Sequence, residues 1–177
     1  MMAGDSGFPW QHSFPPFYTQ QPHAETRLKQ LETWRQIVLD YCRRKGQTSI
    51  DVVEIATSDL FNNQAINRRV DGDFLNIILS HLQSKGNLEW SDKTKRRAHI
   101  YWRSPEEWAR LIYAFVSKSG MNSGSAVCTF FELTEGADTV DEPFHGLETD
   151  LLIKSLKILE GQGKAELFQG DEGVKFF

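Results

Sequence analysis

Residues 80–90 read SHLQSKGNLEW, and they indicate the fold most directly, because a helical pattern ends here at a glycine and a strand pattern begins. A glycine directly after the last apolar position commonly ends a helix, because it adopts a left-handed backbone without strain. The alternating residues that follow are typical of a strand. Residues 157–167, KILEGQGKAEL, repeat this junction 77 positions later. Two copies of one structural unit are therefore predicted.

Helical spacing extends the first copy toward the N-terminus. Apolar side chains recur every three or four positions from Leu28 to Tyr41, so we expect a helix that begins near Thr26, its N-cap, and ends near Gly46. The elements expected next are a strand at residues 47–50, a short helix from Asp51, a long helix at 71–85, and strands at 87–90 and 98–102 around a polar turn at 91–97.

The second copy has the same order of elements. Four of its residues repeat the spacing of the first helix at an offset of 74: Trp108, Leu111, Ile112 and Phe115. A strand at residues 127–129, a short helix at 130–134, a long helix at 148–162 and a closing strand at 174–177 complete it. This order is typical of a winged helix. The predicted fold class is α+β, with an extended Pro-rich segment at residues 1–25 before tandem winged helices at 26–102 and 103–177.

Composition and motifs exclude several classes of protein. Of the 177 residues, 40% are hydrophobic and 25% are charged, as in an ordinary globular protein, and no apolar run approaches the ~20 residues of a membrane-spanning helix. None of the five histidines lies in a metal-binding pattern and no phosphate-binding loop occurs, so we expect no enzyme, no cofactor and no metal. Cys42 and Cys128 lie in apolar runs and are expected to be buried thiols, although their spacing also permits one disulfide.

The first 25 residues hold four of the six prolines, with aromatic residues between them. Proline favours an extended backbone, and aromatic rings on a stiff segment are typical of peptides that dock into a partner's pocket. The segment is therefore expected to bind another protein, and packing onto its own first unit is the alternative. The candidate contact residues are Trp10, Phe14, Pro15, Pro16, Phe17 and Tyr18.

The formal charge of −4 is unevenly distributed. Residues 1–102 contain 13 lysines and arginines against 11 aspartates and glutamates, a net +2, whereas residues 103–177 contain 7 against 13, a net −6. Basic residues gather in one turn, where they can contact phosphates or lipid headgroups or simply be solvated: Lys93, Lys95, Arg96 and Arg97. A nucleic-acid-binding winged helix that uses this turn is the alternative function, but neither long helix carries the basic face that reads DNA.

Seven short motifs, in order from end to end, together resemble one family. They are PWQ at residues 9–11, FPPFY at 14–18, LFNN at 60–63, KGNLEW at 85–90, RSPEEW at 103–108, FHGL at 144–147 and GVKFF at 173–177. The chain resembles the small subunit of ESCRT-II, the vacuolar protein-sorting 25 family. That family has tandem winged helices, in agreement with the architecture expected from the repeat.

The resemblance implies a non-enzymatic adaptor that sorts ubiquitinated membrane proteins into multivesicular endosomes. It implies that the N-terminal segment docks onto the two larger ESCRT-II subunits, with two copies of this chain for one of each. It also implies that the second winged helix binds the first helix of a myristoylated ESCRT-III protein and nucleates ESCRT-III assembly. A cytoplasmic chain, recruited to endosomal membranes only through the complex, is expected.

The ESCRT-III helix is basic in that family, which suits the net charge of −6 on residues 103–177. The acidic loop at residues 136–142 is a candidate for this contact, or it is merely solvated. The candidate residues are Thr129, Phe130, Glu132, Glu135, Asp138, Asp141 and Glu142.

Overall fold

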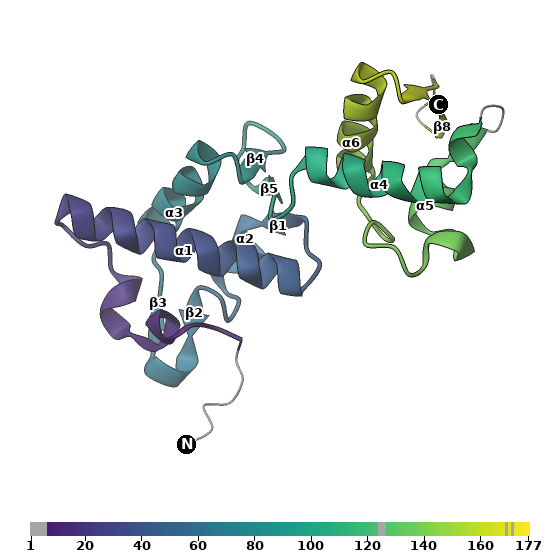
Figure 1. Ribbon diagram of the computed structural model, residues 1–177. Coiled ribbons are helices and arrows are strands. Elements are labelled where there is room, and N and C mark those ends of the chain that lie inside the picture. Colours follow the sequence, from purple (N-terminus) through teal and green to yellow (C-terminus); the bar gives the residue numbers. More distant parts are fainter. Residues whose placement is uncertain (1–6, 124–126, 169, 171) are drawn as a thin grey trace. The chain divides into compact units, whose positions relative to one another are not determined.

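The computed structural model describes residues 7–123, 127–168, 170 and 172–177 (Figure 1). The chain divides into two compact units, residues 1–102 and 103–177. Each unit combines helices with a small antiparallel sheet, so the predicted α+β class with tandem winged helices is confirmed. Among the described residues, every helix is too short or too polar to cross a bilayer.

The first unit has three principal helices and two small sheets. Its helices are η1 (Trp10–Ser13), η2 (Pro15–Tyr18), α1 (Ala24–Arg44), α2 (Val52–Ala56), η3 (Gln64–Ile66) and α3 (Gly72–Ser84). Its larger sheet has the order β1-β5-β4, from β1 (Ser49–Asp51), β5 (Arg97–Ile100) and β4 (Leu88–Trp90). Strands β2 (Asn62–Asn63) and β3 (Arg68–Arg69) form a separate hairpin around η3, in a stretch where no strand was predicted.

The second unit repeats this plan, and its described residues, 103–123, 127–168, 170 and 172–177, form no counterpart of the small hairpin. Its helices are α4 (Pro105–Ser119), η4 (Met121–Ser123), α5 (Phe130–Thr134), η5 (Ala137–Thr139) and α6 (Thr149–Gly161). Its sheet has the order β6-β8-β7, from β6 (Val127–Thr129), β8 (Gly173–Phe176) and β7 (Ala165–Leu167). Helices α3 and α6 begin and end within one residue of the bounds that the sequence predicted.

The duplication extends to strand register. Ile50 pairs with Ala98 in the first sheet, and Cys128 pairs with Val174 in the second; all four side chains are buried. In each unit, the residue that follows the buried strand residue Ile50 or Cys128 is the N-cap of the short helix. The Asp51 carboxylate accepts hydrogen bonds from Val53 N and Glu54 N, and the Thr129 hydroxyl accepts one from Glu132 N. Each cap satisfies backbone donors that a helix start leaves unpaired.

The long helix of the first unit begins earlier than predicted. Thr26 was expected as the N-cap, but α1 begins at Ala24 behind His23, which makes no side-chain capping hydrogen bond. Pro22 explains the position, because a proline disfavours helical backbone in the residue before it and leaves the residues after it free to start a helix. The inward face of α1 then buries Trp34, Val38 and Cys42 at the centre of the first core.

Candidate functional site

The N-terminal segment packs onto its own unit. Phe17 is 6% exposed and stacks on Trp34, with ring centroids 4.4 Å apart and an angle of 13° between the planes. The Phe17 carbonyl accepts hydrogen bonds from Trp34 Nε1 at 3.1 Å and from Gln30 Nε2 at 3.0 Å. The ring and its carbonyl are therefore both satisfied within the chain.

Tyr18 is anchored next to Phe17. Its ring is buried against Trp34, and its hydroxyl donates a hydrogen bond to the His12 carbonyl at 2.7 Å. Burial raises the pKa of Tyr18 to about 12, so the hydroxyl keeps the proton that it donates.

His12 is the second buried polar anchor of the segment. Its Nε2 lies 2.9 Å from the Leu60 carbonyl, and Asn63 Nδ2 contacts its Nδ1 at 3.4 Å and its carbonyl at 2.9 Å. Burial lowers the pKa of His12, although the nearby carbonyls and Asp59 oppose this shift. The neutral imidazole fits these contacts, with Nε2 donating and Nδ1 accepting.

The expectation of an extended segment whose aromatic rings lack a site in their own chain is wrong for Phe17 and Tyr18. The segment forms two 3-10 helices instead, closed by hydrogen bonds such as Phe17 N to Phe14 O at 3.0 Å. The physical reason is that the φ angle that proline imposes also suits a 3-10 turn. Two turns then place Phe17 and Tyr18 against α1. There both rings contact the Trp34 ring, and the Gln30 amide donates a hydrogen bond to the Phe17 carbonyl.

Trp10 and Phe14 remain exposed, at 69% and 48%. Their rings form an edge-to-face pair with centroids 5.8 Å apart. Pro16 is also exposed and Pro15 is half-buried. We call Trp10, Phe14, Pro15 and Pro16 the aromatic ridge. An open hollow of about 360 Å³ lies beside it, lined in part by residues of α1.

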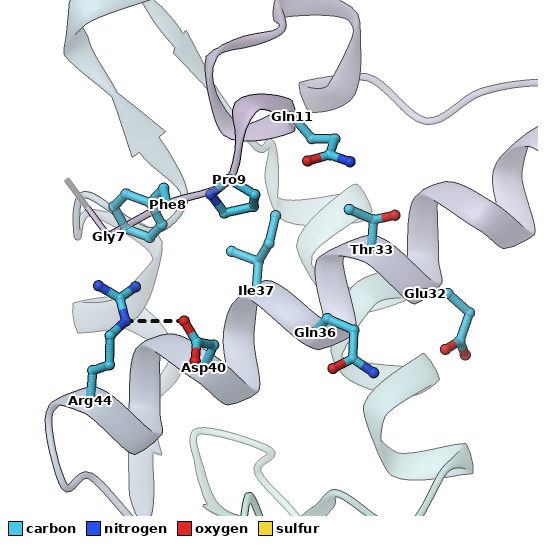
Figure 2. A pocket seen from close by; sticks show the side chains of 10 residues that line it. All are labelled: Gly7, Phe8, Pro9, Gln11, Glu32, Thr33, Gln36, Ile37, Asp40 and Arg44. Atoms are coloured by element: carbon cyan, nitrogen blue, oxygen red, sulfur yellow. Dashed lines mark hydrogen bonds and ion pairs between the residues drawn. The ribbon is translucent and has the colours of Figure 1, made fainter. Parts of the chain in front are cut away.

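A larger groove of about 730 Å³ lies between residues 7–11 and α1 (Figure 2). Pro9 and Ile37 line its apolar part, and Asp40 at its edge accepts a hydrogen bond from Arg44 Nε at 3.1 Å. Gln11 Oε1 is buried and has no hydrogen-bond partner among the described residues. Sequence reasoning missed this groove, because it exists only once residues 7–11 lie along α1.

The basic wing, Lys93, Lys95, Arg96 and Arg97, lies in and beside the turn between β4 and β5, and all four residues are exposed. Arg96 Nε contacts Asp51 Oδ2 at 3.2 Å. Helix α3, whose sequence is GDFLNIILSHLQS, contains neither lysine nor arginine. The structure therefore gathers the four predicted cations but supplies no basic helix beside them.

The predicted ESCRT-III contact residues have different environments. Thr129 uses its hydroxyl as the α5 cap, and Phe130 is 8% exposed, so these two residues have structural roles. The acidic members are exposed, except for the half-buried Glu142: Glu132, Glu135, Asp138, Asp141 and Glu142. Sequence reasoning missed Phe131, which is 65% exposed. Phe130 and Leu133 are three positions apart and share the buried face of α5, so the helical period would have indicated that Phe131 lies off that face.

The remaining candidate chemistry is structural. Cys42 and Cys128 are both buried and free, and burial raises the pKa of each thiol to about 12. Within the described ranges, no three His, Cys, Asp or Glu residues are placed to hold a metal ion.

Comparison with known proteins agrees with this architecture. Residues 11–148 match the family model described as ESCRT-II complex subunit. Vacuolar protein-sorting-associated protein 25 of Danio rerio is 48% identical over 172 residues, which cover 96% of this chain and 98% of the relative. The Homo sapiens protein of that name is 47% identical over 178 residues, covering 99% of this chain and 100% of the relative.

Solved structures give the same result. The crystal structure of subunit VPS25 of the endosomal trafficking complex ESCRT-II has a TM-score of 0.84 at 33% identity, with 97% of this chain and 99% of that chain covered. VPS25 is also present in the crystal structure of the endosomal complex ESCRT-II (VPS22/VPS25/VPS36), and a chain of that structure has a TM-score of 0.81 at 34% identity, covering 97% and 100%.

The fold and these matches define the class of protein: a non-enzymatic subunit of a multiprotein complex, built from tandem winged helices. The chain belongs to the vacuolar protein-sorting-associated protein 25 family of ESCRT-II subunits.

Proposed function

We propose that this chain is the adaptor of ESCRT-II in sorting ubiquitinated membrane proteins into multivesicular endosomes. Its aromatic ridge docks onto the two larger subunits, the counterparts of VPS22 and VPS36, with two copies of this chain for one of each. The chain is cytoplasmic and reaches the endosomal membrane as part of this complex. The observation that carries the proposal is the exposed Trp10–Phe14 pair, 69% and 48% accessible, beside the buried anchors Phe17 and Tyr18.

The physical argument rests on preorganisation. Two large rings exposed to water are unfavourable in an isolated chain, and tryptophan is among the residues that most often dominate binding energy. Phe17 and Tyr18 hold the backbone that carries these rings, so little conformational entropy remains to be lost when a partner covers them. Docking thus needs a pocket for Trp10, Phe14 and the adjoining prolines.

The test is co-expression of this chain with its two larger subunits, followed by affinity purification. Changing Trp10→Ala and Phe14→Ala together is expected to weaken the association by about 700-fold, since hot-spot side chains contribute ~2 kcal/mol or more each. Val53→Ala is the matched control, because Val53 is 61% exposed on α2 of the same unit. Full retention of the complex by the double variant would refute docking through the ridge.

The second unit is proposed to recruit ESCRT-III by binding the first helix of a myristoylated subunit. Exposed carboxylates on and after α5, from Glu132 to Asp141, support binding of a basic helix. The exposed Phe131 on the same short helix adds an apolar contact to this acidic surface.

The rival function, nucleic-acid binding through the basic wing, has weaker support. Helix α3 begins behind Asp71 and carries Asp73 in its first turn, and acidic residues there repel phosphates. A duplex-DNA titration distinguishes the two functions, because specific binding would fall steeply with salt and with reversal of the wing charges.

A further inference from the structure

We propose that the basic wing of the first unit contacts the anionic surface of a lipid bilayer directly. The proposed adaptor function brings the chain to membranes only through its partners, and this contact is additional to it. The wing places four cations within five consecutive positions, 93–97, and every one of them is exposed.

Hydrogen bonds within the turn define its shape. Asp92 Oδ1 accepts hydrogen bonds from Thr94 N at 2.9 Å and from Thr94 Oγ1 at 2.6 Å. Ser91 N donates to the Arg97 carbonyl at 2.9 Å, which closes the hairpin. Lys95 has a φ of 55°, in the left-handed region, as the tight reversal requires. The cations are therefore presented on a bonded turn rather than on a loose loop.

Arg96 differs from the other three cations. It contacts Asp51, and its carbonyl accepts a hydrogen bond from Val52 N at 2.8 Å, so it ties the wing to the start of α2. Across the part of the chain that the structure describes, Lys93, Lys95 and Arg97 have no carboxylate within 4.0 Å. These three charges are available to an external anion.

The placement favours a flat, diffuse anionic partner over nucleic acid. A DNA-binding winged helix inserts a helix into the major groove, and α3 has no cation for this purpose. Binding to a membrane surface requires no helix inserted into a groove. Each Lys or Arg that comes within a Debye length of anionic lipid adds independently to the binding free energy. Each such cation strengthens partitioning by about fivefold, so three give about a hundredfold at low salt.

The test is co-sedimentation of the full chain with vesicles of phosphatidylcholine, with and without about 30% phosphatidylserine, at about 50 mM salt. We expect binding to the phosphatidylserine vesicles. The variant Lys93→Glu/Lys95→Glu/Arg97→Glu should lower that binding at least tenfold. The matched control is Arg110→Glu/Lys118→Glu/Lys157→Glu, which makes the same change in net charge at three exposed residues of the second unit and should keep most of the binding.

Three outcomes would overturn the inference. They are absence of wild-type binding to phosphatidylserine vesicles, an equal loss in both triple variants, and wing-dependent binding to duplex DNA in the absence of vesicle binding. Circular dichroism of both variants checks that they remain folded. Because Trp10 and Phe14 are unchanged in both, assembly with the larger subunits should persist, which separates this test from that of the proposed function.

Discussion

Phe17 stacks on Trp34 with a centroid separation of 4.4 Å, and the Trp34 indole donates a hydrogen bond to the carbonyl of the same Phe17. The Trp34 side chain thus holds both the ring and the backbone carbonyl of Phe17, which lies 17 positions earlier in the chain. This contact makes the N-terminal segment part of the first core and leaves Trp10 and Phe14 outside it. The same segment therefore has a buried half, which stabilises the fold, and an exposed half.

Phe17→Ala should reduce the free energy of unfolding of the first unit by about 3–5 kcal/mol, because it removes a buried ring and leaves a cavity against Trp34. Phe14→Ala is the matched control, with an expected loss under about 1 kcal/mol since its ring is 48% exposed. Urea unfolding measures both. Equal losses would mean that Phe17 is not an anchor. For this reason Phe17 is a poor probe of docking, whereas Trp10 and Phe14 are good ones.

The stability of the first unit should fall as the pH drops below about 6.5, the ordinary pKa of histidine. The pKa of His12 is lowered in the folded chain, so below pH 6.5 the unfolded chain binds a proton that the folded chain resists. The loss continues until the pH reaches the lowered pKa of the folded state. Above pH 6.5 both states hold a neutral imidazole and this contribution is constant.

Unfolding midpoints at about pH 7.5, 6.5 and 5.5 measure this effect. His12→Gln keeps an amide donor for the Leu60 carbonyl but cannot titrate, so its midpoint should change less over this range. The carboxylate of Glu32 affects stability in a lower pH range. Its pKa is lowered mainly by the hydrogen bond from His81, so its contribution to the free energy of unfolding is lost only as the pH falls below about 4.5. An unchanged pH profile in His12→Gln would contradict the assignment to His12.

Thr129→Ala should destabilise the second unit by about 1 kcal/mol, because it removes the α5 cap, whereas Thr129→Ser keeps the hydroxyl and should cost much less. Thermal unfolding gives both values. If Thr129→Ala weakens ESCRT-III binding without lowering stability, the residue contacts the partner and the capping account of its role is wrong.

Binding of the proposed ESCRT-III helix should weaken as salt rises from about 50 to 500 mM, because exposed charges are screened. Asp138→Lys with Asp141→Lys should weaken binding further at low salt and flatten the salt dependence. Phe131→Ala should weaken binding at both salt concentrations, because an apolar contact is not screened. Isothermal titration calorimetry with the helix as a synthetic peptide measures all three. Salt-independent binding by the unchanged chain would eliminate the electrostatic part of this proposal.

Local patterns predicted most elements. Periodic apolar residues and the glycines after them located α1, α3 and their counterparts α4 and α6, because helix period and helix termination depend on neighbouring residues. The small hairpin at Asn62–Asn63 and Arg68–Arg69 was missed. Two-residue strands have no readable period, and their pairing depends on contacts across the turn.

The candidate site was predicted in part. The residues of FPPFY and Trp10 were identified, but their division into anchors and exposed ridge was not. Likewise, the wing cations could be read from the sequence, whereas the engagement of Arg96 by Asp51, 45 positions away, could not. In both places the missing information was a long-range contact.

The duplicated winged helix could be predicted from the amino-acid sequence, because the order of helices and strands follows from local periodicity and turn residues. Which aromatic rings of the N-terminal segment are exposed could be learned only from the packed structure. That choice depends on the burial of Phe17 and Tyr18 against Trp34 of α1, and a side chain's access to solvent is settled only when distant parts of the chain pack together.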